Sequence, residues 1–233
     1  MTLQLGFLLY PGLTQLDLTG PFEVLSRLPG ATVHLVWKEP GVVTADTGLG
    51  LVATRGFADC PPLDLVFVPG GGGQIALMQD DAVLEWIAAR GAEARWVTSV
   101  CTGALVLGAA GLLRGYRAAT HWGFQPLLAL FGATPVAERV VVDRNRITAG
   151  GVTAGIDFGL RVVAEVAGED VAKTIQLYLE YDPAPPFACG HPRSAPAELV
   201  ERVRAGFAER YAVREEQLRG LMARAAGRGD TAR

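Results

Sequence analysis

Cysteine is scarce in this chain of 233 residues, and excess charge and signal-like segments are also lacking. The cysteines at positions 60, 101 and 189 are few and odd in number, which argues against a disulfide framework and predicts a reducing, cytoplasmic location. The formal net charge of -3 gives no electrostatic reason to bind nucleic acid or an anionic membrane. No basic region precedes the apolar run at residues 1–10, so no secretory signal is expected.

One segment, residues 96–113, carries no charged side chain and is as long as a short transmembrane helix of about 18 residues. It begins with a β-branched run at 96–100 and meets a glycine at position 103. Such a run, followed by a Leu/Ala/Gly stretch, is typical of a buried strand, a sharp turn and a buried helix. We therefore expect no membrane span and no membrane partner.

Hydrophobic residues make up 50% of the chain and charged residues 19%, which suits one α/β domain with ample core. Apolar runs alternate with helical patterns, as in βαβ units with a mostly parallel sheet. The expected strands are residues 3–10, 31–38, 63–69, 95–100, 116–120 and a less regular set within 134–148. The expected helices are residues 21–28, with Pro21 in the first turn, and 80–90, 102–113, 124–131, 153–166 and 171–179.

The proline-rich segment 182–196 is expected to be a loop, and it separates two parts of the chain. Residues 1–192 form the predicted α/β domain that contains the active site. Residues 193–233 form a predicted helical extension whose end frays. Its amphipathic face carries Leu199, Val200, Val203 and Phe207, and we expect it to pack on the domain or on a partner subunit. About forty residues are too few for the two helix-turn-helix motifs of an appended DNA-binding module.

Three features follow predicted strands: Asp17 after the first, the glycines at 70–73 after the third, and Cys101 after the fourth. Ligands of open doubly wound sheets bind outside the carboxyl ends of strands, where the strand order reverses. With a strand order of 2-1-3-4, the first and third strands flank that point and the fourth lies beside it. All three features are then expected in one cleft.

Cys101 lies at a strand-to-helix junction, in the sequence SVCTG. Such a turn presents a side chain at the sheet edge, where backbone N–H groups and the helix dipole favour a thiolate. Lowering a thiol pKa from about 8.5 to about 6 raises the thiolate fraction at pH 7 from about 3% to roughly 90%. A reactive nucleophile is the favoured interpretation, and a buried structural cysteine is the alternative.

The run Gly70, Gly71, Gly72 and Gly73 after Pro69 has no Walker lysine and does not match the dinucleotide-binding spacing. Two interpretations remain. Exposed N–H groups of the run can stabilise a developing anion near Cys101, or the run is a plain flexible turn.

Other polar residues leave alternatives open. Asp17, flanked by leucines, is either a helix N-cap or an active-site acid. His121, which ends a predicted strand, is either the partner of the cysteine or a structural histidine. Cys60 and Cys189 show no paired C-x-x-C spacing, so no metal site is expected.

Several motifs together resemble the ThiJ/PfpI superfamily and, within it, the isonitrile hydratases, over residues 5 to about 192. They are GFL at 6–8, QLDLTGP at 15–21, DLVFVPGG at 64–71, VTSVCTG at 97–103, ATHW at 119–122, GVTAGID at 151–157, QLYLEY at 176–181 and PPF at 185–187. The resemblance implies a flavodoxin-like three-layer α/β sandwich, a nucleophilic cysteine on an elbow, no metal or cofactor, and a homodimer.

One departure from the wider superfamily is informative. Protease-like members place His directly after the elbow cysteine and Glu on the first-strand side, whereas this chain has Thr102 and Asp17. Peptide hydrolysis is therefore not expected, because no adjacent imidazole can protonate an amine leaving group. In isonitrile hydratases, the positions of Asp17, Cys101 and Thr102 are associated with catalysis.

The activity implied by the resemblance is hydration of a small-molecule isonitrile to an N-substituted formamide through a Cys101 thioimidate. Asp17 is the expected general acid and base, and the two groups are expected to share one proton. The expected oxyanion or substrate-binding residues are Gly71, Gly72, Gly73, Thr102 and His121. The alternatives are glyoxalase or deglycase chemistry, in which His121 matters more, and a redox sensor based on Cys101 oxidation.

Overall fold

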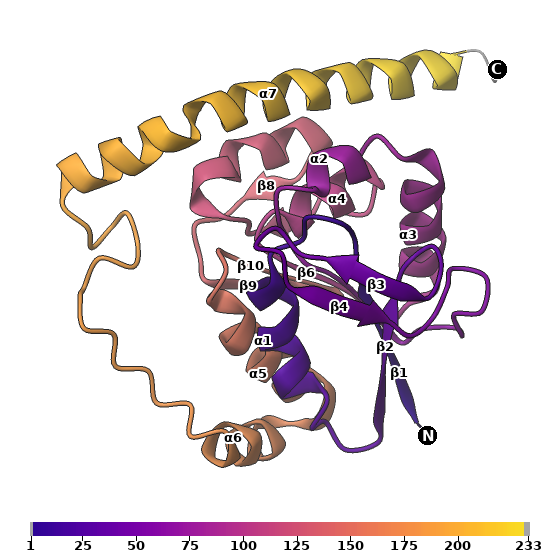
Figure 1. Cartoon of the computed structure of the whole chain (residues 1–233), viewed down its shortest axis with the longest axis vertical. Coiled ribbons are helices and arrows are strands. Elements are labelled where there is room, and N and C mark those ends of the chain that lie inside the picture. The colour runs from indigo at the N-terminus through magenta and orange to yellow at the C-terminus, as the bar shows by residue number, and fades with distance from the viewer. Residues whose placement is uncertain (1, 231–233) are drawn as a thin grey trace.

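The computed structural model describes residues 2–230, with side chains described through Leu221 and at Ala223. A six-stranded sheet in the order β2-β1-β5-β6-β10-β9 forms its centre (Figure 1). All neighbouring pairs are parallel except β10 with β9. The strands are β1 (Leu3–Leu8), β2 (Ala31–Val36), β5 (Leu65–Val68), β6 (Trp96–Val100), β9 (Val140–Asp143) and β10 (Arg146–Ala149). The predicted parallel sheet with a 2-1-3-4 strand order is confirmed.

Helices cover both faces of this sheet (Figure 1). On one face lie α1 (Gln15–Leu25), α5 (Ala154–Ala167) and α6 (Glu169–Tyr178), and on the other α3 (Asp81–Glu93), α4 (Gly103–Ala109) and the 3-10 helix η1 (Trp122–Phe131). Strands enclosed on both faces need apolar side chains in both directions, which is why every residue of β5 is buried. The α/β sandwich is thus confirmed.

The segment that resembles a membrane span divides as expected into β6, a turn and α4. Burial between the helical layers hides its apolar side chains. Across the described residues, no helix is both long and apolar enough to cross a membrane.

Several local predictions were wrong. Helix α1 begins at Gln15, so Pro21 lies inside the helix and not in its first turn. A proline there cannot donate an N–H to the preceding turn, and its ring instead packs closely on Gly155 of α5. The antiparallel hairpin of β3 (Gly41–Thr44) and β4 (Gly50–Ala53) was not predicted, because it lies apart from the main sheet. Three short elements lie between those already named: α2 (Gln74–Leu77), β7 (Arg117–Ala118) and β8 (Thr134–Pro135).

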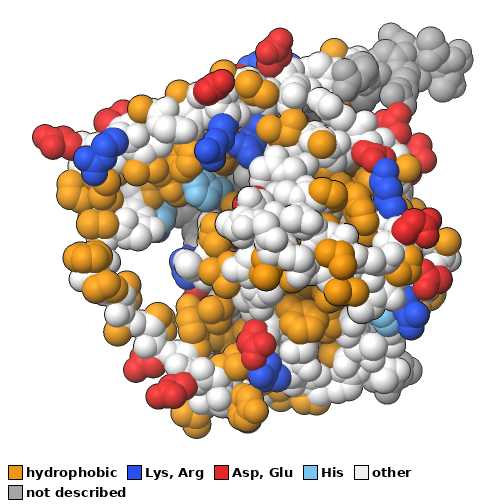
Figure 2. Space-filling view, viewed as in Figure 1, with side chains coloured by type: hydrophobic (Ala, Val, Ile, Leu, Met, Phe, Trp, Pro, Cys, Tyr) orange, Lys and Arg blue, Asp and Glu red, His pale blue; other side chains and the backbone are white. Residues whose placement is uncertain are grey.

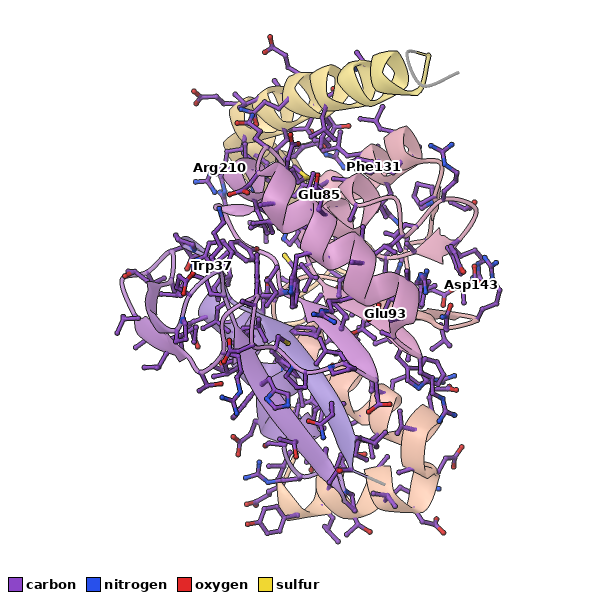
Figure 3. All side chains as sticks on the ribbon, turned by 90° about the vertical axis from the view of Figure 1, so that its right-hand side faces the viewer. Trp37, Glu85, Glu93, Phe131, Asp143 and Arg210 are labelled. Atoms are coloured by element: carbon purple, nitrogen blue, oxygen red, sulfur yellow. The ribbon has the colours of Figure 1, made fainter. Side chains whose placement is uncertain are left out.

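Residues 182–196 form an extended connection, as predicted, to the single long helix α7 (Ala197–Asp230). Helix α7 packs on η1 and α4 and lies across the end of the molecule opposite α6 (Figures 1 and 3). Its inward face carries Phe207, Tyr211, Arg214 and Leu218, whereas Val203 of the predicted face is exposed. The helix continues to Asp230, so the predicted fraying could concern only residues outside those described.

Candidate active site

Cys101 occupies the sharp turn between β6 and α4. Its φ of 54° lies in the left-handed region, which is strained for a residue with a side chain and is typical of a nucleophile elbow. The backbone N–H of Cys101 donates to the carbonyls of Ala149 (3.1 Å) and Gly150 (2.8 Å), which fixes the turn to β10. The side chain is buried, with 6% of the residue exposed.

Asp17 lies against this thiol from the first turn of α1. It is fully buried, and its Oδ2 accepts a hydrogen bond of 3.1 Å from the N–H of Gly70. The Cys101 thiol lies beside the same carboxyl group, and each affects the pKa of the other, while Oδ1 has no hydrogen-bond partner within the described structure. The N-cap position of α1 is Thr14, so the capping interpretation of Asp17 was wrong. The carboxyl group faces the nucleophile and keeps one oxygen available for a substrate or a water.

Burial governs the protonation of this pair. It raises the pKa of Asp17 from 3.8 to about 7, although the hydrogen bonds from Cys101 and Gly70 act in the opposite direction. Burial and then the charge of Asp17 raise the pKa of the Cys101 thiol well above its usual value. The hydrogen bond from the Thr102 N–H lowers the thiol pKa but does not offset these effects, so the expected thiolate does not follow from the helix N-terminus alone. With its pKa near 7, the Asp17 carboxyl group is close to the point at which it gains or loses a proton at neutral pH.

Thr102 continues the elbow and is 3% exposed. Hydrogen bonding from its backbone N–H and its hydroxyl lowers the pKa of the Cys101 thiol, and the hydroxyl also donates to the Gly71 carbonyl at 3.5 Å. The hydroxyl oxygen also accepts a hydrogen bond of 3.1 Å from the Gly71 N–H. Thr102 therefore links the nucleophile to the glycine run.

The glycine run packs tightly against both neighbouring turns. A Cβ on Gly70 would lie 2.6 Å from the Thr102 nitrogen, 2.7 Å from Asp17 Oδ2 and 2.8 Å from the Cys101 Cβ. These three groups thus surround a single point that only a glycine leaves open. A Cβ on Gly73 would lie 1.9 Å from the Pro11 carbonyl oxygen.

The N–H groups of the run are largely committed within the protein. Gly71 donates to Thr102, and Gly73 donates to the Gly12 carbonyl at 3.0 Å. Gly72 is exposed, and a Cβ added to it would meet no described atom within 4 Å. In this structure the run serves close packing around the elbow, and the N–H groups of Gly71 and Gly73 are not free for an oxyanion.

His121 lies apart from the thiol hydrogen bonds. Its Nδ1 accepts a hydrogen bond of 3.2 Å from the Gly123 N–H, and its ring packs on Trp122, Phe124 and Phe207. Burial, followed by the charge of Arg214, lowers its pKa to about 4, so the ring is neutral at pH 7. No hydrogen bond among the described residues joins His121 to Cys101.

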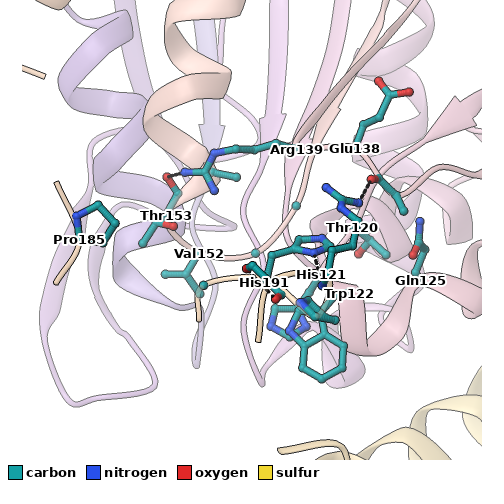
Figure 4. A pocket seen from close by; sticks show the side chains of 18 of the residues that line it. Thr120, His121, Trp122, Gln125, Glu138, Arg139, Val152, Thr153, Pro185 and His191 are labelled. Carbon is teal, nitrogen blue, oxygen red and sulfur yellow. Dashed lines mark hydrogen bonds between the residues drawn. The ribbon is translucent and has the colours of Figure 1, made fainter. Parts of the chain in front are cut away.

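A cavity of about 840 Å³ lies between this part of the domain and the connection to α7 (Figure 4). His121, Trp122, Arg139, Val152 and His191 line it. In the space-filling view, the molecule is hollowed on this side (Figure 2). Thr120 and Gly150, which bond to the Cys101 backbone, also line the cavity, whereas Cys101 itself is not among the lining residues.

Residues 4–165 match the family model described as the DJ-1/PfpI family. The chain belongs to the DJ-1/PfpI family. It is 54% identical over 216 residues to an isonitrile hydratase of Pseudomonas putida, with 93% of this chain and 95% of that protein covered. A DJ-1/PfpI structure from Pseudomonas syringae, described as a ThiJ/PfpI family protein, has a TM-score of 0.88 and 46% identity over 95% of this chain and 91% of that one. The predicted family resemblance is confirmed.

Another relative is longer than this chain. The transcriptional regulator GbdR of Pseudomonas aeruginosa, of the helix-turn-helix type, is 30% identical over 76% of this chain and 50% of its own length. Among the described residues of the present chain, the connection at 182–196 leads into helix α7.

The other cysteines of this DJ-1/PfpI protein lie outside the site. Cys60 is buried and Cys189 is exposed, and all three cysteines are free. Within residues 2–230, no group of three or more His, Cys, Asp or Glu side chains is arranged to hold a metal ion.

Sequence reasoning missed one charged residue near the thiol, Arg214 of α7. It is 4% exposed, and its charge acts on both Cys101 and Tyr10. The sequence signal was an arginine within the stripe Phe207, Tyr211 and Leu218, where the helical spacing calls for an apolar side chain.

Proposed function

We propose that this DJ-1/PfpI protein hydrates isonitriles to N-substituted formamides. The observation that carries the proposal is the buried contact between the Cys101 thiol and the Asp17 carboxyl group. The Pseudomonas putida relative named isonitrile hydratase, at 54% identity, supports the same conclusion. The reaction needs a nucleophile and a proton donor on one carbon atom, and this pair supplies both.

The first half-reaction uses the proton that the pair holds. In the reacting form the proton lies on Asp17 and the sulfur is a thiolate. The sulfur bonds to the terminal carbon of the isonitrile, and Asp17 transfers its proton to that carbon. The product is a thioimidate on Cys101 beside an ionised Asp17. Because the pKa of Asp17 is about 7, the carboxyl group is suited to give this proton and later to accept another at neutral pH.

The second half-reaction adds water. Asp17 takes a proton from a water molecule while the water oxygen bonds to the thioimidate carbon. Asp17 then passes that proton to the nitrogen of the former isonitrile. Asp17 then removes the remaining hydroxyl proton as the carbon–oxygen double bond forms and the carbon–sulfur bond breaks. The thiolate leaves with the bonding electrons, the formamide is released, and the pair again holds one proton.

Thr102 supports the sulfur in this scheme. Its N–H and hydroxyl face the thiol, so they stabilise negative charge on sulfur before attack and after expulsion. The Gly71 and Gly73 N–H groups act indirectly, because they are bonded to Thr102 and Gly12. We keep His121 as a residue of the adjoining substrate cavity.

The alternative chemistries find less support in the geometry. Glyoxalase or deglycase chemistry relies on His121, which makes no described hydrogen bond to Cys101 and is neutral because its pKa is about 4. A peroxide sensor needs a reactive thiol but gives no role to the Asp17 carboxyl group that lies buried beside Cys101.

We further propose a cytoplasmic homodimer in which residues 1–192 hold the reacting groups and residues 193–233 are a helical extension. Three free cysteines suit a reducing compartment. No nucleic-acid or membrane partner is proposed, given the net charge of -3. Size-exclusion chromatography with light scattering measures the oligomeric state.

The test is direct turnover. Purified protein is incubated with a simple alkyl isonitrile, and the formamide is quantified by proton NMR, with methylglyoxal and peroxide in parallel assays. We expect formamide from the wild type, none above background from Cys101→Ala, and unchanged rates from the control Cys189→Ala. No turnover of several isonitriles by folded protein, with clean oxidation of Cys101 by peroxide, would contradict the proposal.

A further inference from the structure

Arg214 is a buried cation without a described counter-ion. It lies on the inward face of α7, where 4% of the residue is exposed, and Leu218 one turn later is fully buried. Its Nε and Nη1 are enclosed and have no hydrogen-bond partner within the described structure. Leaving a guanidinium desolvated and unpaired is costly, so the surroundings of this group must compensate its charge or offer it a ligand.

Aromatic side chains hold the arginine in place. The guanidinium carbon lies 4.1 Å from the centre of the Phe124 ring. That ring stacks on Tyr211 at 6.3 Å and contacts Phe207 at 5.7 Å, both from α7. Helix α7 and η1 therefore fix the side chain through packing, and the aromatic face gives the cation a favourable contact. This contact satisfies one face of the guanidinium and leaves its Nε and Nη1 groups without acceptors among the described residues.

Helix α7 packs on α4 (Figure 1). Because α4 begins directly after the Cys101 elbow, helix α7 brings this cation to the end of the molecule that contains the elbow. At that end of the molecule the charge of Arg214 acts on Cys101, Tyr10 and His121. Within α7 itself it interacts with Arg210. The remaining charged groups that act on the thiol or its neighbours are Asp17 and Asp46.

Only one buried anion in this set can balance the arginine. Burial raises the pKa of Tyr10 well above 10, and its hydroxyl donates to the Pro69 carbonyl at 2.9 Å, so it stays neutral. His121 is neutral as well. Asp46 is exposed and accepts a hydrogen bond from Thr14. The Cys101 thiol, which lies beside Asp17, is the group left to balance the arginine: burial lowers the pKa of Arg214, and the charge of Cys101 acts to raise it.

We propose that Arg214 is a positioning residue that acts as the counter-cation of the Cys101 and Asp17 pair, so that the C-terminal helix is part of the active site. The proposal rests on the proposed function through the one-proton pair, but it does not depend on which substrate reacts. The arginine stabilises the state in which the sulfur is ionised and Asp17 is protonated. Packing of α7 beside the elbow thereby increases the fraction of reactive thiolate.

The experiment measures thiolate formation directly. The full-length protein is alkylated with iodoacetamide between pH 6 and pH 10, and the modified Cys101 peptide is quantified by mass spectrometry, which separates it from Cys60 and Cys189. In Arg214→Gln we expect the midpoint of the pH profile to rise by about 1 unit, which makes alkylation at pH 7 about tenfold slower. Arg214→Lys keeps the charge and is expected to restore most of the wild-type profile.

Matched controls separate charge from packing. Arg210→Gln removes the same charge from an exposed position one turn away on α7 and is expected to leave the midpoint unchanged, because solvent screens it. Arg214→Met is the second variant if Arg214→Gln does not fold, because an unbranched apolar chain can still cover the Phe124 ring.

The outcomes are exclusive. An upward shift in the neutral variants, reversed by lysine, supports the proposal even if no isonitrile is turned over. An unshifted midpoint in a folded neutral variant, or equal shifts for Lys and Gln, overturns it even if the protein is an active hydratase.

Discussion

The Asp17 carboxyl group and the Cys101 thiol are in hydrogen-bonding contact inside the protein, and the charge of Asp17 makes ionisation of the thiol harder. Asp17 comes from the helix after β1, and Cys101 from the turn after β6, two strands further across the sheet. Because both groups are buried, a second negative charge is disfavoured. The pair is thereby suited to move one proton between carbon, oxygen and nitrogen atoms of a small substrate.

Replacement of Asp17 by Asn tests the acid and base role. Asn has the same shape, and its carbonyl can accept the Gly70 N–H, so we expect the fold to persist. It cannot give or accept the catalytic proton, and formamide production is expected to fall by at least about 100-fold. The measurement is the initial rate of formamide formation together with the circular dichroism spectrum.

A matched control removes a carboxylate that takes no part in the chemistry. Asp46→Asn changes an exposed side chain that accepts a hydrogen bond from Thr14 and acts on Asp17 only through its charge. We expect its rate to stay within about threefold of wild type, since solvent screens exposed charges. Substantial turnover by Asp17→Asn would rule out the acid role.

The raised pKa of Asp17 also predicts a pH-dependent stability. The unfolded carboxyl ionises near 3.8, whereas the folded one ionises near 7, so wild-type stability attributable to Asp17 falls as pH rises through this window. Above pH 7 the ionised Asp17 lowers the free energy of unfolding by at most about 4 kcal/mol. Urea unfolding at pH 5 and pH 8 is expected to show Asp17→Asn gaining stability over wild type, more so at pH 8. A difference that shrinks with pH would show that the folded carboxyl group is not destabilised.

The glycine run offers a paired steric test. In Gly70→Ala, the new methyl group meets Asp17, Cys101 and Thr102 at less than 3.0 Å. We expect a loss of about 1–3 kcal/mol in unfolding free energy and a large fall in rate. Gly72→Ala, with open space around its Cβ, is expected to behave as wild type in thermal melts and turnover. Equal effects of the two substitutions would refute the packing role of Gly70.

Thr102 is tested through its hydroxyl. Thr102→Val removes the acceptor of the buried Gly71 N–H, which is expected to cost about 1–3 kcal/mol, and weakens support of the sulfur. Thr102→Ser keeps the hydroxyl and is expected to restore both stability and rate. Chemical denaturation and steady-state kinetics give the two readouts. A Val variant that kept stability and rate while Ser lost them would show that the methyl group and not the hydroxyl is the functional part.

Sequence patterns predicted most elements because local apolar periodicity reflects burial. The runs at β5 and β6 are continuous because both of their faces are covered, and the turn at Cys101 follows from the strand, Thr102 and Gly103. The start of α1 was missed because Pro21 normally marks a first turn, and its accommodation depends on Gly155 in a distant helix.

The sequence by itself determined the family and the identity of the candidate pair, since these depend on local patterns and motifs, whereas the strand order had to be assumed and was supplied by the structure. Only the tertiary structure decided the protonation of Asp17 and Cys101, the use of the glycine N–H groups and the approach of Arg214. The reason is physical: pKa values and hydrogen-bond partners depend on burial and on charges brought together from distant parts of the chain.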